Sequence, residues 1–387
     1  MDHSDNSGSI AYVITSLSMG GAQKVLLSLL DAAHQQTPPL VISLLPVEGL
    51  EADFRARGAE LFCLNLKRPW QLLPHLLRLR QRLQQRRVRL MYSMLHHANL
   101  VALLLRLLVY PHPDLLWGIH DTPEKGLYTR WSHRLVLWLT CRFASVPEGI
   151  VLVSGRSRER YRQLGYPVDR LHLIPNGVRI PPLDHKQREL DSLAVRQELG
   201  IPADSLLLGS LTRAVPEKDL PGLLSAFATL QSLQPQVHLL LAGEGVSTDN
   251  PELTALLHSL HLRGKVHLLG MRHDVPRLLH ALDVATLPSR SEAFPLFIAE
   301  ALAARIPCVA TDVGDIVLLL GQDGRCGRLV APGHPQQLVA AWHELLRMPA
   351  ASRRQLGEQG CQRVWEHFSE HTMREQHARL FARLGVA

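Results

Sequence analysis

Short apolar segments alternate with longer amphipathic segments along most of the chain. Apolar runs of about four to six residues, bounded by Gly, Pro, Asn or Asp, are typical of strands buried in a parallel sheet. The segments between them repeat apolar residues every three or four positions, which predicts helices. The predicted strands are 10–14, 40–45, 60–64, 90–93, 115–119, 149–153 and 171–174 in the first half, and 206–211, 237–241, 266–270, 284–287, 306–310 and 327–330 in the second.

This alternation predicts an α/β fold built from doubly wound parallel sheets. With 387 residues, the chain exceeds the size of about 250–300 residues at which a single core stops growing. A Pro-rich polar stretch, Ile180 to Asp184, interrupts the alternation and is the predicted interdomain linker. We therefore expect two domains, residues 1–182 and 183–365, followed by a C-terminal helix at 366–387.

Charge and cysteine content narrow the range of partners and compartments. The net charge of +7 favours anionic partners, namely nucleotide phosphates, nucleic acid or an anionic membrane surface. The five Cys form no C-x-x-C pair, which argues against a zinc site or a disulfide framework and fits a reducing cytosol. The first nine residues lack the apolar core of a signal peptide, and the apolar runs are too short to span a bilayer. The expected location is the cytoplasm, with the inner face of the cytoplasmic membrane as a peripheral site.

In the second half, two carboxylates flank a predicted helix start. Glu292 lies in a loop, Pro295 suits a first helical position, and Glu300 follows in the helix. The N–H groups at 296–298 would favour an anion such as a diphosphate, and the carboxylate of Glu300 would accept hydrogen bonds from vicinal hydroxyls. An ordinary amphipathic helix with two solvated carboxylates is the alternative.

Two cations and two Gly-rich turns follow other predicted strands of the same half. Arg213 and Lys218 flank one loop, where they would neutralise a diphosphate, although surface charge is the alternative. Gly243 and Gly270 end the next two strands. All these positions lie at carboxyl ends of strands, where doubly wound sheets bind ligands.

The first half contributes fewer candidates. Gly20 and Gly21 follow the first strand and precede a helix that begins near Gln23, which suits close approach of a phosphate but also a plain βα turn. His120 follows the strand at 115–119, although a lone histidine is more often structural. The segment from Arg78 to Arg89 predicts a basic amphipathic helix that contacts an anionic membrane or forms a solvated face. It contains no aromatic residue, which argues against nucleic acid.

The order of these motifs resembles that of glycosyltransferase family 4. The motifs are Gly20-Gly21-Ala22, Ile174-Pro175-Asn176-Gly177-Val178, Arg213-x4-Lys218, Gly243-Glu244-Gly245, the strand at 266–270, Glu292-x7-Glu300 and Ala310 to Gly314. The resemblance covers about residues 8 to 384. It implies the GT-B fold, with two Rossmann-like domains facing each other across a cleft. It also implies a retaining, metal-independent enzyme that uses a nucleotide diphosphate sugar and no cofactor.

The resemblance also implies a role for each matched residue. The N-terminal domain would lie on the acceptor side, the second domain would bind the nucleotide sugar, and the C-terminal helix would cross back to the first domain. The implied catalytic residues are His120, Arg213, Lys218 and Glu292. The implied donor-binding residues are Gly20, Gly21, Arg213, Lys218, Gly243, Arg272, Glu292, Phe294, Leu296 and Glu300. No metal ligand is implied, and no D-x-D motif occurs.

Three positions depart from the family pattern. Ala293 stands where the loop usually has Gly, so its Cβ would crowd the sugar or strain the backbone if φ were positive. Arg305 also replaces an expected Gly, and His334 replaces an expected Asp. None of these changes removes a charged functional residue.

The predicted reaction is transfer of a sugar from a nucleotide diphosphate sugar to a hydroxyl, with retention. A UDP-sugar is favoured and GDP-mannose is the alternative. The acceptor would be a glycan or a lipid-linked molecule in bacterial cell-surface polysaccharide or lipopolysaccharide synthesis. The alternatives are a GT-B sugar-nucleotide epimerase and a non-enzymatic peripheral membrane-binding protein; a phosphorylase would need a pyridoxal phosphate lysine that the sequence does not identify.

Overall fold

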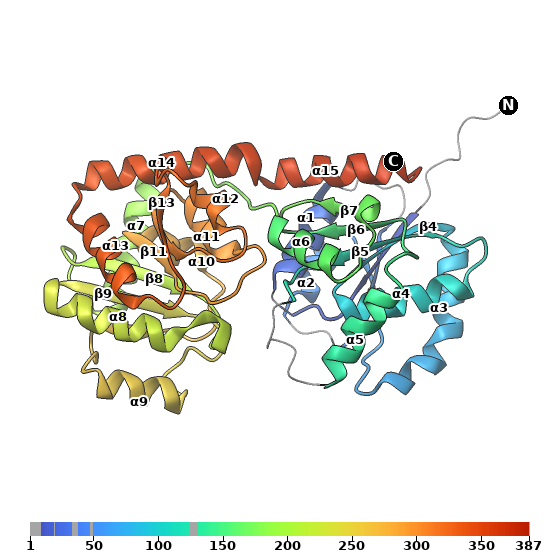
Figure 1. Cartoon of the computed structure of the whole chain (residues 1–387), viewed down its shortest axis with the longest axis horizontal. Helices are drawn as coiled ribbons and strands as arrows, with labels where there is room; N and C mark the ends of the chain where they lie inside the picture. Colours follow the sequence, from blue (N-terminus) through green and yellow to red (C-terminus); the bar gives the residue numbers. More distant parts are fainter. Residues whose placement is uncertain (1–8, 19, 33–37, 47–48, 124–130, 387) are drawn as a thin grey trace. The chain divides into compact units, whose positions relative to one another are not determined.

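The computed structural model divides the chain into two compact units, shown in Figure 1. It describes residues 9–386 except 19, 33–37, 47–48 and 124–130. Unit 1 comprises Met1–Gly177 and Glu370–Ala387, and unit 2 comprises Val178–Ser369. These limits lie a few residues from the expected boundaries at 182/183 and 365/366. The last helix, α15 (Glu370–Arg383), belongs to unit 1.

The described strands of unit 1 form one parallel sheet in the order β3-β2-β1-β4-β5-β6-β7. From β1 the chain proceeds to β2 and β3 toward one edge of the sheet, and from β4 it proceeds to β5, β6 and β7 toward the other edge. The strand order therefore reverses between β1 and β4. The strands are β1 (Ser9–Ile14), β2 (Leu40–Ser43), β3 (Glu60–Cys63), β4 (Val88–Met94), β5 (Asp114–Ile119), β6 (Gly149–Leu152) and β7 (Leu171–Leu173).

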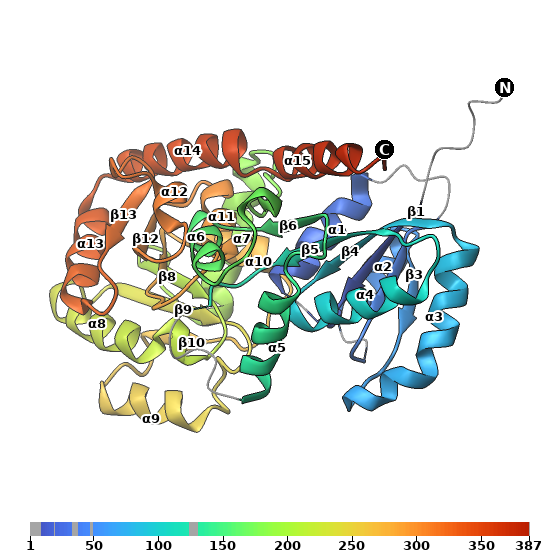
Figure 2. The same cartoon turned by 45° about the vertical axis from the view of Figure 1, so that its right-hand side comes forward.

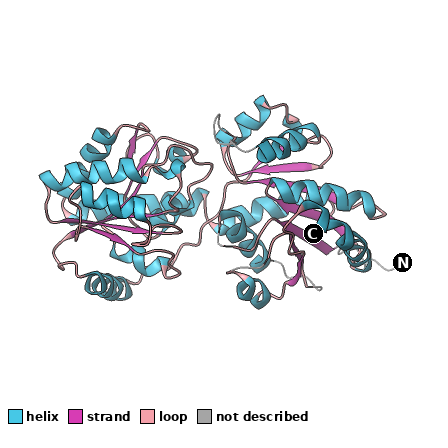
Figure 3. Cartoon of the chain, turned by 90° about the horizontal axis from the view of Figure 1, so that it is seen from below, coloured by secondary structure: helices cyan, strands magenta, loops and turns pink. Residues whose placement is uncertain are grey.

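Helices cover both faces of this sheet (Figures 2 and 3). Leu26 of α1 and Leu380 of α15 pack in the core on one face, and Leu79 of α3 and Leu105 of α4 pack in the core on the other. Besides α15, the helices are α1 (Gly21–Ala32), α2 (Glu51–Ala56), η1 (Pro69–Leu72), α3 (Leu73–Gln85), α4 (His96–Leu108), α5 (Trp131–Arg142), α6 (Gly155–Gln163) and η2 (Val168–Arg170).

The C-terminal helix α15 is held in unit 1 by polar contacts as well as by its apolar side. The hydroxyl of Tyr92 in β4 lies 3.2 Å from Nε2 of His377, and Nδ1 of His377 lies 3.0 Å from the Met373 carbonyl oxygen. Arg374 donates to the Ser28 hydroxyl of α1 at 3.0 Å. The two ends of the chain therefore build one core.

Two arginines of the basic segment from Arg78 to Arg89 have a structural role. Arg82 and Arg86 both form ion pairs with Glu60 of β3, and Arg86 also donates to the Pro38 carbonyl oxygen. The hypothesis that this segment contacts a membrane stays a prediction, although Arg82 and Arg86 already share the single carboxylate of Glu60 within unit 1. Arg78 and Arg80 are exposed.

Unit 2 contains a second parallel sheet, in the order β10-β9-β8-β11-β12-β13. Its order reverses between β8 and β11. The strands are β8 (Leu206–Leu211), β9 (Val237–Ala242), β10 (Val266–Leu268), β11 (Val284–Leu287), β12 (Cys308–Thr311) and β13 (Gly327–Val330). The helices are α7 (His185–Leu199), η3 (Pro216–Lys218), α8 (Leu220–Leu233), α9 (Pro251–Ser259), α10 (Val275–Ala281), α11 (Leu296–Ala303), α12 (Ile316–Leu320), α13 (Pro335–Arg347) and α14 (Ala350–His367).

Most predicted strands are confirmed to within one or two residues at each end. Two details of the α11 region differ from expectation. Pro295 is the N-cap, with φ −80° and ψ 90°, rather than the first helical residue. The N–H of Ile298 donates to the Pro295 carbonyl oxygen at 3.1 Å, so it is not available to a ligand. Among the described residues, no helix is long and apolar enough to cross a membrane.

Close packing of α14 against α11 depends on glycine. A Cβ placed on Gly357 would lie 2.0 Å from the carbonyl oxygen of Arg305, just after α11. Arg305 has φ 61°, a left-handed conformation that costs a non-glycine residue about 1–2 kcal/mol. The backbone of Arg305 therefore follows directly from the end of α11 and also packs against Gly357 of α14.

Substitution of Gly357→Ala should lower the free energy of unfolding by about 1–3 kcal/mol, because α14 must move away from the Arg305 carbonyl. Urea unfolding followed by circular dichroism would measure this change. Ser352→Ala, at an exposed position of the same helix, is the control and should change the free energy by less than about 0.5 kcal/mol. Equal effects of the two variants would contradict the packing argument.

Candidate functional site

The loops that follow β8 and β11 lie side by side because these two strands are neighbours in the sheet of unit 2. Arg213 and Lys218 come from the loop after β8, and Glu292 comes from the loop after β11. This is the position where the strand order reverses. Ligands of doubly wound sheets bind at the carboxyl ends of the strands at such a position.

Lys218 and Glu292 form an ion pair, although they are 74 residues apart in the sequence. Their side chains are only 18% and 9% exposed. The Ser289 hydroxyl donates to the same oxygen of Glu292, Oε1, at 2.6 Å. Two residues predicted separately as catalytic therefore lie in direct contact.

The N-terminus of α11 follows Glu292 closely in the sequence. Leu296 and Phe297 occupy the first helical positions, where N–H groups have no partner within the helix. The positive end of the helix dipole adds to their preference for an anion. Glu300 lies one turn further along α11 and is half-buried.

The loop before α11 has an ordinary backbone at Ala293. This residue is not among the described non-glycine residues with positive φ, so it carries no strain of that kind. The side chain of Phe294 is buried, and its ring lies 5.6 Å from that of Phe368, so only its backbone can face a ligand. A Cβ on Gly314 would lie 2.4 Å from the Glu292 carbonyl oxygen. The position of this loop therefore requires glycine at 314.

Gly243 and Gly270 both adopt positive φ, at 142° and 65°. A Cβ on Gly243 would lie 2.1 Å from the carbonyl oxygen of Thr212, directly before Arg213. Its N–H donates to the Gly270 carbonyl oxygen at 2.7 Å. Gly243 is therefore required for the turns after β8, β9 and β10 to pack closely, and its role is at least partly structural.

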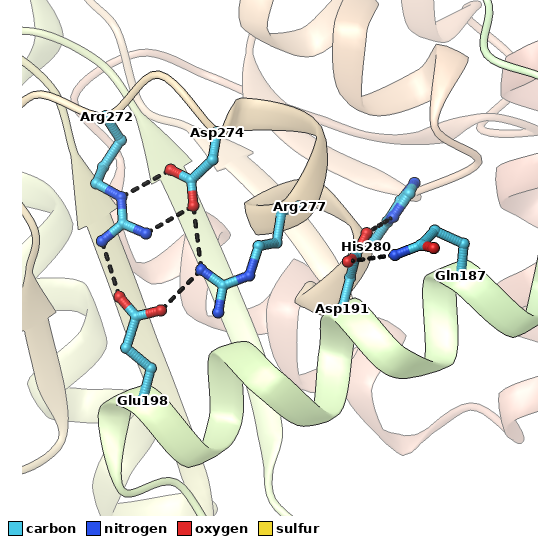
Figure 4. A network of polar contacts seen from close by, with 7 residues as sticks. All are labelled: Gln187, Asp191, Glu198, Arg272, Asp274, Arg277 and His280. Carbon is cyan, nitrogen blue, oxygen red and sulfur yellow. Dashed lines mark hydrogen bonds and ion pairs between the residues drawn. The ribbon is translucent and has the colours of Figure 1, made fainter.

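The two predicted arginines have different surroundings. The Arg213 side chain is exposed at the end of β8. Arg272 instead donates to Asp274 at 2.7 and 2.6 Å and to Glu198 of α7 at 2.8 Å, in the network of Figure 4. Arg277 bridges the same two carboxylates, and together the arginines lower the pKa of Asp274. Arg272 thus joins α7 to the loop before α10, and its contact with a base stays a prediction.

In unit 1, the predicted residues lie at or near the strand reversal between β1 and β4. Gly21 is the first residue of α1, and the Gly20 carbonyl accepts a hydrogen bond from the Lys24 N–H at 3.1 Å. Met19, which precedes them, lies outside the described residues. His120 directly follows β5, the neighbour of β4.

His120 has an unusual environment for a histidine. Both ring nitrogens are buried and make no hydrogen bond within the part of the chain that the structure describes. Burial, followed by the nearby His377, lowers the pKa of His120 to about 4, while Asp121 opposes this shift. The ring is therefore neutral near pH 7, and its one N–H donor and one acceptor have no partner among the described residues. This environment suits a hydrogen-bonding role better than general acid catalysis.

The structure also identifies a polar cluster that the sequence did not. Leu95, between β4 and α4, has φ 76° and ψ 148°, a region that non-glycine residues avoid at a cost of about 1–3 kcal/mol. The next residue, His96, contacts Asp121 at 3.2 Å and the Tyr161 hydroxyl at 2.8 Å. The only sequence signal was the placement of His96 and Asp121 after adjacent strands.

Two surface hollows of unit 2 contain none of the predicted site residues. They share His185, Arg188, Leu282 and Asp283. Asp283 directly precedes β11, so these hollows lie at the amino ends of the strands, opposite the predicted site. Within the described ranges, no group of three or more His, Cys, Asp or Glu is arranged to hold a metal ion.

Comparison with protein families assigns both halves of the chain. Residues 19–180 match the model for Glycosyltransferase Family 4, and residues 191–363 match the model for Glycosyl transferases group 1. The chain belongs to glycosyltransferase family 4. The resemblance inferred from the motifs is confirmed.

Curated relatives of this family 4 glycosyltransferase match it over part of their length. MMP alpha-(1->4)-mannosyltransferase of Mycolicibacterium hassiacum is 30% identical over 226 residues, which cover 58% of the chain and 51% of that protein. N-acetyl-alpha-D-glucosaminyl L-malate synthase of Bacillus anthracis is 28% identical over 194 residues, or 49% of each protein. The chain thus spans about half the length of the curated relatives it matches.

Solved structures match the fold over almost the whole chain. HepE of Anabaena in complex with UDP-glucose has a TM-score of 0.83 at 22% identity, covering 97% of this chain and 99% of HepE. WaaG, a glycosyltransferase involved in lipopolysaccharide biosynthesis, has a TM-score of 0.74 at 18% identity, covering 96% and 99%. The expected α/β GT-B fold is confirmed.

The Lys218–Glu292 pair should show strong energetic coupling in this glycosyltransferase. Lys218→Met or Glu292→Gln alone should cost about 2 kcal/mol of stability, because each leaves a poorly solvated polar or charged partner behind. The double variant should cost less than the sum of the single variants by about 1–2 kcal/mol. Urea unfolding would measure this cycle.

The exposed Arg325–Asp323 pair provides a control, since Arg325→Met should change stability by less than about 0.5 kcal/mol. Additive effects of Lys218→Met and Glu292→Gln would contradict the coupling.

Acid should destabilise unit 1 between about pH 6.5 and pH 4. Burial lowers the pKa of both His120 and His377 to about 4, so the unfolded chain binds protons that the folded chain cannot bind in this range. The free energy of unfolding should therefore fall as the pH falls from about 6.5. His377→Gln should make this dependence shallower in urea titrations at several pH values.

His371→Gln, at an exposed position of the same helix, should leave the pH dependence of stability unchanged. If His377→Gln retained the full loss of stability on acidification, His377 would not contribute to it.

Proposed function

We propose that this glycosyltransferase moves a sugar from a nucleotide diphosphate sugar to a hydroxyl group, with retention of configuration. The observation that carries the proposal is the Lys218–Glu292 ion pair at the strand reversal of unit 2, where Glu292 precedes the first residue of α11, Leu296, by four positions. A UDP-sugar is the favoured donor, and the complex of HepE with UDP-glucose supports this choice. GDP-mannose is the alternative, since one relative is a mannosyltransferase.

The charges around this pair suit a departing diphosphate. Lys218 supplies a point charge and Arg213 a planar, exposed guanidinium at the adjacent strand end. The N–H groups of Leu296 and Phe297 add two donors. Charges that are already in position when the bond breaks need no reorganisation, and such electrostatic stabilisation is usually the largest catalytic contribution.

Glu292 and Glu300 suit the hydroxyl groups of the donor. We assign Glu292 to the transferred sugar and Glu300 to the ribose, with Gly243, Phe294 and Leu296 contributing backbone contacts. Lys218 and the Ser289 hydroxyl both contact Oε1 of Glu292 and so orient its carboxylate. Gly20, Gly21 and Arg272 remain predicted donor contacts.

We propose a front-face mechanism for the transfer. The bond between the sugar and the diphosphate breaks through an oxocarbenium-like state, and the leaving phosphate oxygen accepts the proton of the attacking hydroxyl on the same face. The sequence identifies no Asp or Glu that would act as a nucleophile in the first domain. Neutral His120 would stabilise the sugar through a hydrogen bond without carrying charge.

We further propose that the reaction needs neither a metal ion nor a cofactor, because the cationic side chains take the role of a metal at the diphosphate. The proposed acceptor is a glycan or a lipid-linked molecule of bacterial cell-surface polysaccharide or lipopolysaccharide synthesis. The name of WaaG and its structural likeness support this class. The proposed place of action is the cytoplasm, at the inner face of the cytoplasmic membrane.

Lys218→Ala should lower both sugar transfer and donor hydrolysis about 100- to 1,000-fold, since it removes one cation from the leaving diphosphate. Chromatography of the released nucleotide would measure both reactions, after thermal stabilisation across a panel of nucleotide sugars has identified the donor. The anomeric configuration of the product, read by NMR, tests retention, and a metal chelator should leave the rate unchanged.

Lys186→Ala removes an exposed lysine elsewhere in unit 2 and is the matched control. Unchanged turnover of Lys218→Ala would overturn the proposed role. Conversion of the donor to an isomeric nucleotide sugar without any acceptor would instead favour the epimerase alternative.

A further inference from the structure

The helices α3, α4 and α5 form one layer on the same face of the unit 1 sheet. Leu79 of α3, Leu105 of α4 and Leu137 of α5 all pack on the core cluster of that face. The helix α4 contacts both α3 and α5. Figure 2 shows the three helices in this layer. Side chains that point away from the cluster therefore share one outer surface.

This outer surface exposes large apolar side chains. Trp131 and Trp138 of α5 are 77% and 60% exposed, Leu107 of α4 is 66% exposed, and Leu77 of α3 is 75% exposed. Leu135 of α5 is also exposed. We call the outer surface that carries these five residues the three-helix face.

The spacing on α5 shows that the exposed residues are organised rather than scattered. Trp131, Leu135, Trp138 and Arg142 follow one another at intervals of four, three and four, so they form a single stripe along the helix. Arg134 lies beside this stripe and is exposed. The opposite side of α5 supplies Leu137 and Thr140 to the interior.

The charge of the chain is concentrated in the same region. Residues 60–148 contain thirteen Lys and Arg but only five Asp and Glu, a net charge of +8, whereas the whole chain carries +7. The rest of the chain is therefore net negative. The sequences of α3, α4 and α5 contain no acidic residue at all.

Some of these cations are used within unit 1, but others face outward. Arg82 pairs with Glu60, and Arg106 of α4 pairs with Glu148 at 2.6 Å. Arg78, Arg80 and Arg134 are exposed on α3 and α5. The three-helix face thus combines exposed Trp and Leu with positive charge and carries no opposing carboxylate on its helices.

We propose that the three-helix face docks unit 1 on an anionic lipid surface. Trp131 and Trp138 enter the interfacial region of the bilayer, where amphipathic aromatic side chains are enriched. Leu77, Leu107 and Leu135 contact the outer part of the acyl chains, and Arg78, Arg80 and Arg134 contact the headgroups. The leucines favour lipid over nucleic acid, whose recognition would use the tryptophans and arginines but gain little from exposed leucine.

This inference rests on the proposed function for its purpose, which is to bring the enzyme to a lipid-linked acceptor. The docking itself does not require a donor or an acceptor. The proposed contact surface comprises three helices rather than the Arg78–Arg89 segment alone, and the tryptophans of α5 are the inserted residues.

Co-sedimentation of the full chain with vesicles tests the proposal. Vesicles of equal parts phosphatidylglycerol and phosphatidylcholine should bind the chain, and pure phosphatidylcholine vesicles should bind it much more weakly. The double variant Trp131→Ser/Trp138→Ser should weaken binding at least about tenfold, and Arg134→Gln should weaken it about fivefold, the effect of one cation at such a surface. Brominated lipids should quench tryptophan fluorescence less in the double variant.

Trp365→Ser and Arg263→Gln are matched controls, because both residues are exposed in unit 2. These variants should bind vesicles like the unchanged chain, and circular dichroism should show that all variants are folded. Equal loss in the controls, no preference for anionic vesicles, or unchanged binding of the tryptophan variant would overturn the proposal. Loss of single-stranded RNA binding, with vesicle binding unchanged, would assign the face to nucleic acid instead.

The two proposals can fail separately. Thermal stabilisation by the nucleotide sugar should persist in Trp131→Ser/Trp138→Ser, because these residues lie in unit 1, far in sequence from Lys218 and Glu292. If vesicle binding fails while this stabilisation persists, only the docking proposal is wrong. If vesicles bind but no nucleotide sugar stabilises the chain, the proposed function is wrong instead.

Discussion

The parallel pairing of β8 with β11 is the constraint on which the candidate site depends. These strands are far apart in the sequence, yet their register, with Val284 opposite Leu208, places their carboxyl ends together. This pairing brings the loops of Lys218 and Glu292 together. Gly209 within β8 permits close contact with Leu282, since a Cβ there would lie 2.4 Å from a methyl group of that leucine. The ion pair, the loop before α11 and the helix N-terminus all follow from one strand pairing.

Much of this arrangement could be predicted from the sequence. Apolar runs located the strands, because a buried parallel strand needs apolar side chains on both faces. The rule that ligands bind at the carboxyl ends of strands then predicts that Arg213, Lys218, Glu292 and Gly243 belong to one site. The assignments of individual residues to donor, sugar or ribose came from the family resemblance and remain predictions.

Side-chain partners were less predictable, because periodicity gives the face on which a residue lies but not its neighbour. Arg272 contacts Glu198 and Asp274 instead of an open surface, and Arg82 and Arg86 share Glu60. Leu95 has a backbone conformation that its side chain gives no reason to expect. Such details depend on tertiary contacts between residues that are distant in sequence, and a single sequence does not contain a direct signal for them.

The assignment of α15 to unit 1 has a consequence for biosynthesis. Unit 2 is one continuous segment, so its core can form as soon as residue 369 has left the ribosome. Unit 1 lacks Met373 and Leu380, which fill its core beside Tyr92, until the last helix is made. Although domains generally fold from the N-terminus during synthesis, here the N-terminal unit would be the last to complete its core. Until then, the apolar side chains of unit 1 that pack with Met373 and Leu380 would stay exposed to water.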